Sequence, residues 1–170
     1  MIATAIGAVV TREVDGQPLV LISPQSTSAD YVKRIDAVAQ EMLANDTAMR
    51  AVLSQNTRNL TAEPVRRSLA TMRQLLASTG TELTRMRKEK LVPEPFNSSH
   101  GKLVTAAATL DQHYDAMARA IAATNAADQQ QALLAARTLD TRYAELLMDY
   151  LRDYQQRLLS AGFRLDKAPR

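Results

Sequence analysis

Two histidines, His100 and His113, are the side chains best suited to bind a metal ion or to move a proton near neutral pH. A di-iron site in a helical bundle needs a Glu three residues before such a histidine, but Asn97 and Leu110 occupy those positions. The two histidines also lie thirteen residues apart in the sequence, which turns them about 220° from each other on a helix. They are therefore not expected to share a metal ion.

The other arrangements that could support catalysis are equally sparse. Asp111 and Asp115 flank His113, but residues two apart on a helix point in nearly opposite directions, so we interpret the three as a solvent-exposed flank. The chain has no cysteine, no glycine-rich phosphate loop and no nucleophile elbow around a serine. We therefore expect no metal, no cofactor and no enzymatic activity.

Polar residues interrupt the apolar side of the expected helices. Asn45, Thr79 and His100 lie in line with apolar residues, and Asp140 lies beside such a line. A buried polar side chain needs a hydrogen-bond partner, and one such residue often fixes how helices align. We interpret these four residues as fixing the alignment of the helices; the alternative is contact with a ligand or a partner.

Four long helices must position these residues. From residue 28 onward, apolar side chains recur every three or four positions, which is typical of helices with one buried face. The expected inward residues are Tyr31, Ile35, Val38, Met42, Asn45, Met49 and Val52 in the first helix; Val65, Leu69, Met72, Leu76, Thr79, Leu83 and Met86 in the second; Phe96, His100, Leu103, Ala107, Leu110, Tyr114, Met117, Ile121 and Thr124 in the third; and Leu133, Ala136, Leu139, Tyr143, Leu146, Leu147, Tyr150, Tyr154 and Leu158 in the fourth.

The helix boundaries are also visible in the sequence. Thr61 is the expected cap of the second helix and Pro64 its early proline, while the stretch 93–95 contains two prolines that separate the second helix from the third. Residues 125–128 separate the third from the fourth, and Gly162 ends the fourth. Short connections place neighbouring helices antiparallel, so the expected fold class is all-α, an antiparallel up-down-up-down four-helix bundle of residues 28–162. The alternative is a pair of long helical hairpins that dimerise through the same apolar residues.

The first 27 residues have a different pattern. Val9, Val10 and Val14 precede Asp15-Gly16, and an apolar run at 19–22 follows. This arrangement predicts a short β-hairpin, with an extended arm as the alternative. The expected organisation is therefore a hairpin or arm at 1–27, the bundle at 28–162 and a C-terminal tail at 163–170.

One end of the antiparallel bundle would gather aromatic, methionine and histidine side chains, because the starts of the first and third helices meet the ends of the second and fourth there. This set, which we call the aromatic pole, comprises Tyr31, Met86, Phe96, His100, Tyr150 and Tyr154. We interpret the aromatic pole as a core layer of large side chains; the alternative is a site for an apolar, acidic small molecule or a partner's peptide.

Beside the aromatic pole lies a basic rim, which comprises Arg85, Arg87, Lys88 and Lys90. Cations in the last turns of a helix oppose its dipole, which is our interpretation of the rim. The alternative is a small patch for an anionic partner. A nucleic-acid partner is not expected, because such surfaces carry a longer basic stripe with aromatic residues between the charges.

Composition limits what kind of protein this is. The net charge is +3, from 21 basic and 18 acidic residues. The longest mainly apolar run, residues 1–10, is about half of what a membrane-spanning helix needs, so no such helix is expected. The chain has 16 Arg against 5 Lys and contains 28 Ala, which indicates a GC-rich bacterial genome. The sequence leaves the location open between the cytoplasm and, if a leader has been removed, a place outside it.

The function predicted from these observations is a non-enzymatic binding or scaffolding module of bacterial origin. It would act through a protein partner or through self-association. The alternative is a small-molecule sensor or carrier with its ligand held at the aromatic pole.

Overall fold

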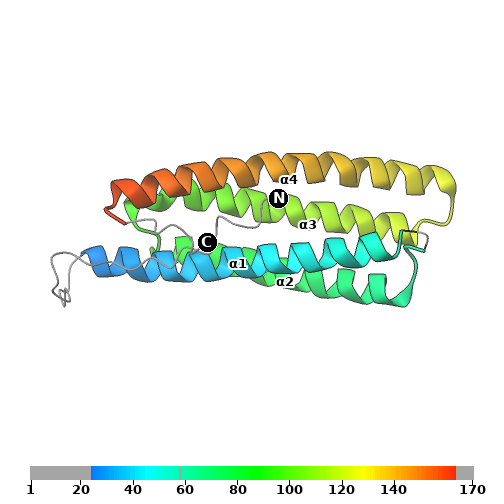
Figure 1. The fold of residues 1–170 in the computed structure, drawn as a ribbon, viewed down its shortest axis with the longest axis horizontal. Coiled ribbons are helices and arrows are strands. Elements are labelled where there is room, and N and C mark those ends of the chain that lie inside the picture. Colours follow the sequence, from blue (N-terminus) through cyan, green and yellow to red (C-terminus); the bar gives the residue numbers. More distant parts are fainter. Residues whose placement is uncertain (1–23, 58, 164–170) are drawn as a thin grey trace, which may run out of the picture.

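A computed structural model describes residues 24–57 and 59–163, and every element within these ranges is helical (Figure 1). The elements are α1 (Pro24–Gln55), α2 (Glu63–Lys88), the short 3₁₀ helix η1 (Glu94–Phe96), α3 (Asn97–Ala122) and α4 (Ala126–Ser160). The expected all-α class is therefore confirmed for this part of the chain.

The predicted β-hairpin at residues 9–22 lies outside the described residues. Helix α1 begins at Pro24, inside the range expected for the arm, because a proline in the first turn costs no hydrogen bond.

The four long helices lie side by side along one axis, with α1 next to α2 and α3 next to α4 (Figure 1). Each helix packs against the next one in the sequence, and α3 and α4 make the most extensive contact. Helices α1 and α4 are linked by side chains, since Arg50 forms an ion pair with Asp140. His100 near the start of α3 contacts Tyr31 near the start of α1 and Leu83 near the end of α2. The chain direction therefore alternates along the bundle.

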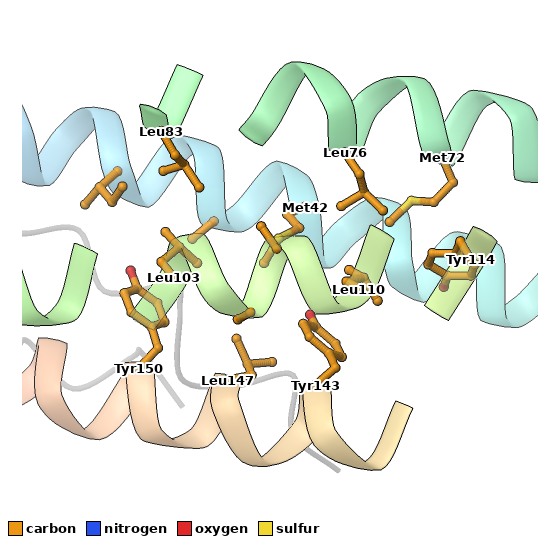
Figure 2. Close-up of a cluster of buried hydrophobic side chains, with 14 of the residues drawn as sticks. Met42, Met72, Leu76, Leu83, Leu103, Leu110, Tyr114, Tyr143, Leu147 and Tyr150 are labelled. Atoms are coloured by element: carbon orange, nitrogen blue, oxygen red, sulfur yellow. The ribbon is translucent and has the colours of Figure 1, made fainter. Parts of the chain in front are cut away.

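All four helices contribute to one hydrophobic core, as Figure 2 shows for side chains such as Met42 of α1, Leu76 of α2, Leu110 of α3 and Tyr143 of α4. The buried residues of α2 are the seven expected ones, from Val65 to Met86. No helix in the described ranges has an apolar stretch long enough to cross a membrane.

Helix α3 is buried on two faces rather than one, because it lies between α2 and α4. Besides the expected residues, it buries a second row that comprises Ser99, Ala106, Thr109, His113, Ala116 and Ala120. Most of these side chains are small, so they let α4 approach closely. The sequence pattern predicted only the first row.

Helix ends follow from local hydrogen bonding. Gly162 has φ +80°, and the Phe163 N–H donates to the Leu158 carbonyl at 3.0 Å, so α4 ends in a Schellman motif as its glycine predicted. Phe163, which was expected in the tail, is buried in the core. Helix α2 ends in the same way, but with Lys90 at φ 56° and the Leu91 N–H donating to the Met86 carbonyl at 2.9 Å.

Helix starts differ from the prediction in one case. The residue that caps α2 is Ala62, which makes no side-chain cap, and the Thr61 hydroxyl donates to Asn59 instead. The predicted Thr61 cap is therefore wrong, although the proline falls in the first turn as expected. At α4, the Asn125 side chain accepts from the Asp128 N–H at 2.9 Å and donates to the Asp128 carboxylate at 2.6 Å. This reciprocal pair fixes the break between α3 and α4.

Candidate functional site

The structure brings the six residues of the aromatic pole together at one end of the bundle. The Phe96 ring lies between Tyr31 and Tyr154, with ring centroids 5.2 Å and 6.0 Å away, and Tyr150 stacks on Tyr154 at 5.4 Å. Met86 is fully buried in the same core. Each of the six side chains is at most 7% exposed.

Hydrogen bonds indicate which ring nitrogen of neutral His100 carries the proton. Its Nε2 lies 2.9 Å from the Leu83 carbonyl oxygen, which can only accept, so Nε2 carries the proton. Its Nδ1 lies 3.3 Å from the Tyr31 hydroxyl and accepts from it. Burial lowers the pKa of His100, and the charge of Arg87 lowers it further, although the bond to Leu83 opposes this shift. His100 is therefore a neutral imidazole that ties α3 to α1 and α2.

A second hydrogen bond of the aromatic pole joins α4 to α1. The Tyr154 hydroxyl donates to the Asp36 carboxylate at 2.8 Å. Burial raises the pKa of Asp36, and this hydrogen bond acts in the opposite direction. The polar atoms of Tyr31, His100 and Tyr154 are thus satisfied by one another and by the neighbouring helices.

The basic rim lies on the last turns of α2, and its four residues have different surroundings. Arg85 forms ion pairs with Glu82, at 2.8 Å, and with Glu89. The Arg87 side chain lies against α3, where a Cβ atom at Gly101 would come within 3.1 Å of its guanidinium. Lys88 and Lys90 are exposed. One of the four charges is therefore offset by carboxylates, and the rim is a smaller positive patch than the sequence indicates.

A polar cluster that the sequence pattern does not reveal links α1, α3 and α4. Asp46 is only 6% exposed, accepts from the Tyr114 hydroxyl at 2.5 Å and pairs with Arg50 at 2.9 Å. Arg50 also donates to Asp140, which is half-exposed on α4. Because Arg50 holds Asp140 by a hydrogen bond, the pKa of that carboxyl is lowered. Asp140 thus links α4 to α1 at the surface of the bundle.

Asn45 does not have the buried position expected for it. Its side-chain amide donates to the Glu41 carbonyl of the same helix at 2.8 Å, and the side chain is half-buried. Both Asn45 and Asp46 fit a helical repeat that includes Met42 and Met49, because spacings of three and four residues are equally regular. The position of the buried polar group could therefore not be decided from the spacing.

His113 is buried, and the expectation of a solvent-exposed flank is wrong for this residue. Its Nδ1 donates to the Ala136 carbonyl of α4 at 2.8 Å, and its ring meets the Tyr114 ring edge-on at 4.7 Å. The reason is the second buried face of α3. Asp115 behaves as expected, since it is partly exposed and pairs with Arg73 of α2 at 2.7 Å.

Tyr143 carries a buried hydroxyl with no hydrogen-bond partner among the described residues. The side chain points from α4 into the core (Figure 2), and its burial raises the pKa of the hydroxyl. Within residues 24–57 and 59–163, no group of three His, Asp or Glu side chains is placed to hold a metal ion.

Helix α4 also carries a distinct outer surface. In the described part of the chain, the exposed large hydrophobic residues are Leu133 (36%), Leu134 (66%), Met148 (49%) and Leu159 (56%), and all of them belong to α4. A hollow of about 520 Å³ lies on this surface and is lined by Leu134, Arg137, Thr138, Thr141, Arg142 and Glu145. This surface does not stand out in the sequence, because leucine occurs on both the inner and the outer side of α4.

A second groove, of about 470 Å³, runs between α1 and α2. Its lining is mostly polar and comprises Val38, Glu41, Thr71, Gln74, Leu75, Ser78, Thr79 and Glu82. Thr79, one of the polar residues expected on the inner side of α2, is buried beneath this groove.

Comparison with known proteins identified no relative of this chain. No family model, no curated protein sequence and no solved structure matches the chain. Function must therefore be inferred from the residues of the chain itself.

Proposed function

We propose that the chain is a non-enzymatic binding module that contacts a protein through the outer face of α4. The observation that carries this proposal is the location of the exposed large hydrophobic residues, which in the described ranges all lie on α4. Leu134, Met148 and Leu159 lie within about 40° of one another around the helix, so they share one face. They lie about 21 and 17 Å apart along the helix, so a partner that lies along α4 would contact all three.

The surroundings of these residues are those of a protein contact surface. Arg137, Arg142 and Glu145 border the apolar side chains and line the hollow beside Leu134. Apolar side chains with charged neighbours give affinity through burial and specificity through charge complementarity. The hollow supplies a place for a side chain of the partner.

The packing of the aromatic pole supports a binding module over the alternative of a small-molecule sensor or carrier. A ligand between these helices would have to separate Tyr31 from His100, or Tyr154 from Asp36, and would leave buried polar atoms without partners. Its binding energy would first have to offset this loss. The outer face of α4 needs no such rearrangement.

Site-specific photo-cross-linking tests the proposal. The full chain, with p-benzoylphenylalanine in place of Met148, is irradiated in the organism that carries the gene, and the adducts are identified by mass spectrometry. The matched control carries the same group in place of Ala77, an exposed residue of α2. We expect an adduct to one identified protein species, which includes a second copy of the chain, from position 148 only. Equal adducts from both positions, or none from position 148, would overturn the proposal.

A thermal-shift experiment addresses the alternative. Purified protein is heated with medium-chain fatty acids and with aromatic carboxylates, the apolar and acidic compounds that the aromatic pole would suit. No increase in Tm is expected. An increase that disappears in Tyr154→Phe would favour the sensor or carrier instead.

A further inference from the structure

The outer face of α4 has a symmetric arrangement of residues about Thr141. Ten exposed residues lie within about 40° of Thr141 around the helix, counting that residue. They are Ala127, Gln130, Leu134, Arg137, Thr141, Glu145, Met148, Arg152, Gln155 and Leu159. Such spacing is symmetric about any helical residue, but here the residue types also match, since Leu134 and Met148 lie seven residues from Thr141 and the oppositely charged Arg137 and Glu145 lie four.

The matching of residue types across Thr141 makes the face complementary to itself. If two such faces meet antiparallel with Thr141 at the two-fold axis, Leu134 lies opposite Met148 of the partner subunit. Arg137 then lies opposite Glu145 of the partner subunit, and Gln130 opposite Arg152 of the partner subunit. Leu134 thus meets an apolar residue, Arg137 a carboxylate and Arg152 an amide. Leu159 lies beyond the paired stretch, because its counterpart at position 123 is outside α4. The small side chain of Thr141 allows the helices to approach closely at the axis.

We infer that the partner of the α4 face is a second copy of this chain, bound antiparallel with its two-fold axis at Thr141. The inference rests on the proposed function, because it names the partner of the same surface. A two-fold dimer uses one patch on both subunits, which is the kind of surface that the symmetry about Thr141 provides. The hollow beside Leu134 would receive Met148 of the partner subunit.

Charge favours the antiparallel arrangement over a parallel one. In a parallel pair with the same residues facing, Arg137 would lie opposite its own copy and Glu145 opposite its own copy, which is repulsive. Glu145 already pairs with Arg142 of its own helix at 3.1 Å, and Arg137 forms no ion pair within the described residues. The antiparallel dimer supplies Arg137 with a carboxylate and gives Glu145 a second cation.

The affinity expected for this dimer is modest. Only Leu134 and Met148 supply large apolar contact near the axis, whereas a stable interface usually buries about 800 Å² on each partner. We therefore expect a weak dimer in exchange with the monomer. Trapping the dimer covalently is the appropriate measurement.

The absence of cysteine from the chain makes a disulfide test specific. In Thr141→Cys, the two introduced thiols would lie at the axis, where Cα atoms can come within the roughly 4.4–6.8 Å that a disulfide spans. We expect this variant to form a disulfide-linked dimer during mild oxidation at micromolar concentration. The matched control is Thr81→Cys, at an exposed threonine of α2. Cross-linking of Thr141→Cys that is no faster than that of Thr81→Cys would overturn the inference.

Charge reversal tests the alignment of the two helices. Arg137→Glu and Glu145→Arg should each weaken dimerisation about tenfold, measured by sedimentation equilibrium. The double variant Arg137→Glu/Glu145→Arg should restore it, because both charges of each intersubunit pair are exchanged. Arg67→Glu, on the exposed side of α2, is the control and should leave the dimer unchanged. A double variant that remains as weak as the single ones would show that this alignment is wrong.

Failure of this inference is distinguishable from failure of the proposed function. If the purified chain stays monomeric at high concentration while position 148 cross-links to a different protein in cells, the second copy is the wrong partner and the binding surface remains. If position 148 cross-links to nothing, both proposals fail. Circular dichroism of each variant shows whether it retains the helical fold of the unmodified chain.

Discussion

The Tyr114 hydroxyl donates a hydrogen bond of 2.5 Å to the Asp46 carboxylate and so joins α3 to α1 across the interior of the bundle. The other carboxylate oxygen of Asp46 accepts from Arg50, so both oxygens have partners. A buried carboxylate is tolerated only when it is hydrogen-bonded or paired in this way. This cluster therefore fixes the position of α1 against the rest of the bundle.

Removal of the Tyr114 hydroxyl should destabilise the fold. In Tyr114→Phe, the buried Asp46 carboxylate loses a hydrogen bond without gaining access to water. Because hydrogen bonds to charged groups contribute about 1.5–3 kcal/mol, we expect the free energy of unfolding to fall by about 2 kcal/mol. Urea unfolding followed by circular dichroism measures this change.

Tyr143→Phe makes the same chemical change at a tyrosine whose hydroxyl is buried without a partner among the described residues, so we expect a different effect on stability. The same change of side chain removes an unsatisfied polar atom here, so the free energy of unfolding should stay the same or rise by up to about 1 kcal/mol. The measurement is the same urea titration. Equal losses in the two variants would mean that the bond to Asp46 is not what stabilises the bundle.

The extent to which sequence predicted this fold depends on how many neighbours each helix has. The sequence identified the core of α2 completely, from Val65 to Met86, because one face of that helix is buried and the spacing leaves one choice. It also predicted that the residues of the aromatic pole would come together, because the alternating helix directions determine which ends meet. Helix α3 was only half predicted, since His113 belongs to a second buried face that a single apolar row does not reveal.

The candidate sites were harder to predict for a physical reason. To predict that Asp46 rather than Asn45 is buried, one must know how α1 is oriented about its own axis. Adjacent residues point about 100° apart, so the spacing alone does not give this orientation. Leu133 was expected inside and is 36% exposed, because the beginning of α4 is less covered than its end. The outer face of α4 is recognisable only after the inner face is known, since leucine and methionine occur on both.

The stability of the protein should decrease in mild acid because of His100. Burial lowers the pKa of His100 below its ordinary value of 6.5, so the unfolded chain binds a proton at a higher pH than the folded chain does. The free energy of unfolding therefore falls as the pH drops below 6.5, by up to about 1.4 kcal/mol per pH unit, until the folded-state pKa is reached. Above pH 6.5, the contribution of His100 to the free energy of unfolding no longer changes with pH.

A comparison with His100→Gln isolates this effect from other titrating groups. The difference in the free energy of unfolding between the unmodified chain and the variant should be constant above pH 7.5 and should become smaller toward pH 5.5. Urea titrations at several pH values give this difference directly. A difference that stays constant over the whole range would contradict a lowered pKa for His100.

The end of α2 should become more stable when Lys90 is replaced by glycine. Lys90 has φ 56°, a left-handed conformation that costs a residue with a side chain about 1–2 kcal/mol, whereas Gly162 occupies the equivalent position at the end of α4. After allowing for the greater freedom of glycine in the unfolded chain, Lys90→Gly should raise the free energy of unfolding by about 0.5–1 kcal/mol. Lys88→Gly is the control, because Lys88 is the last residue of α2 and glycine in a helix should lower stability by a similar amount. Opposite signs for these two variants in urea unfolding would confirm that backbone conformation, rather than loss of a positive charge, determines the effect of Lys90→Gly, and equal signs would refute it.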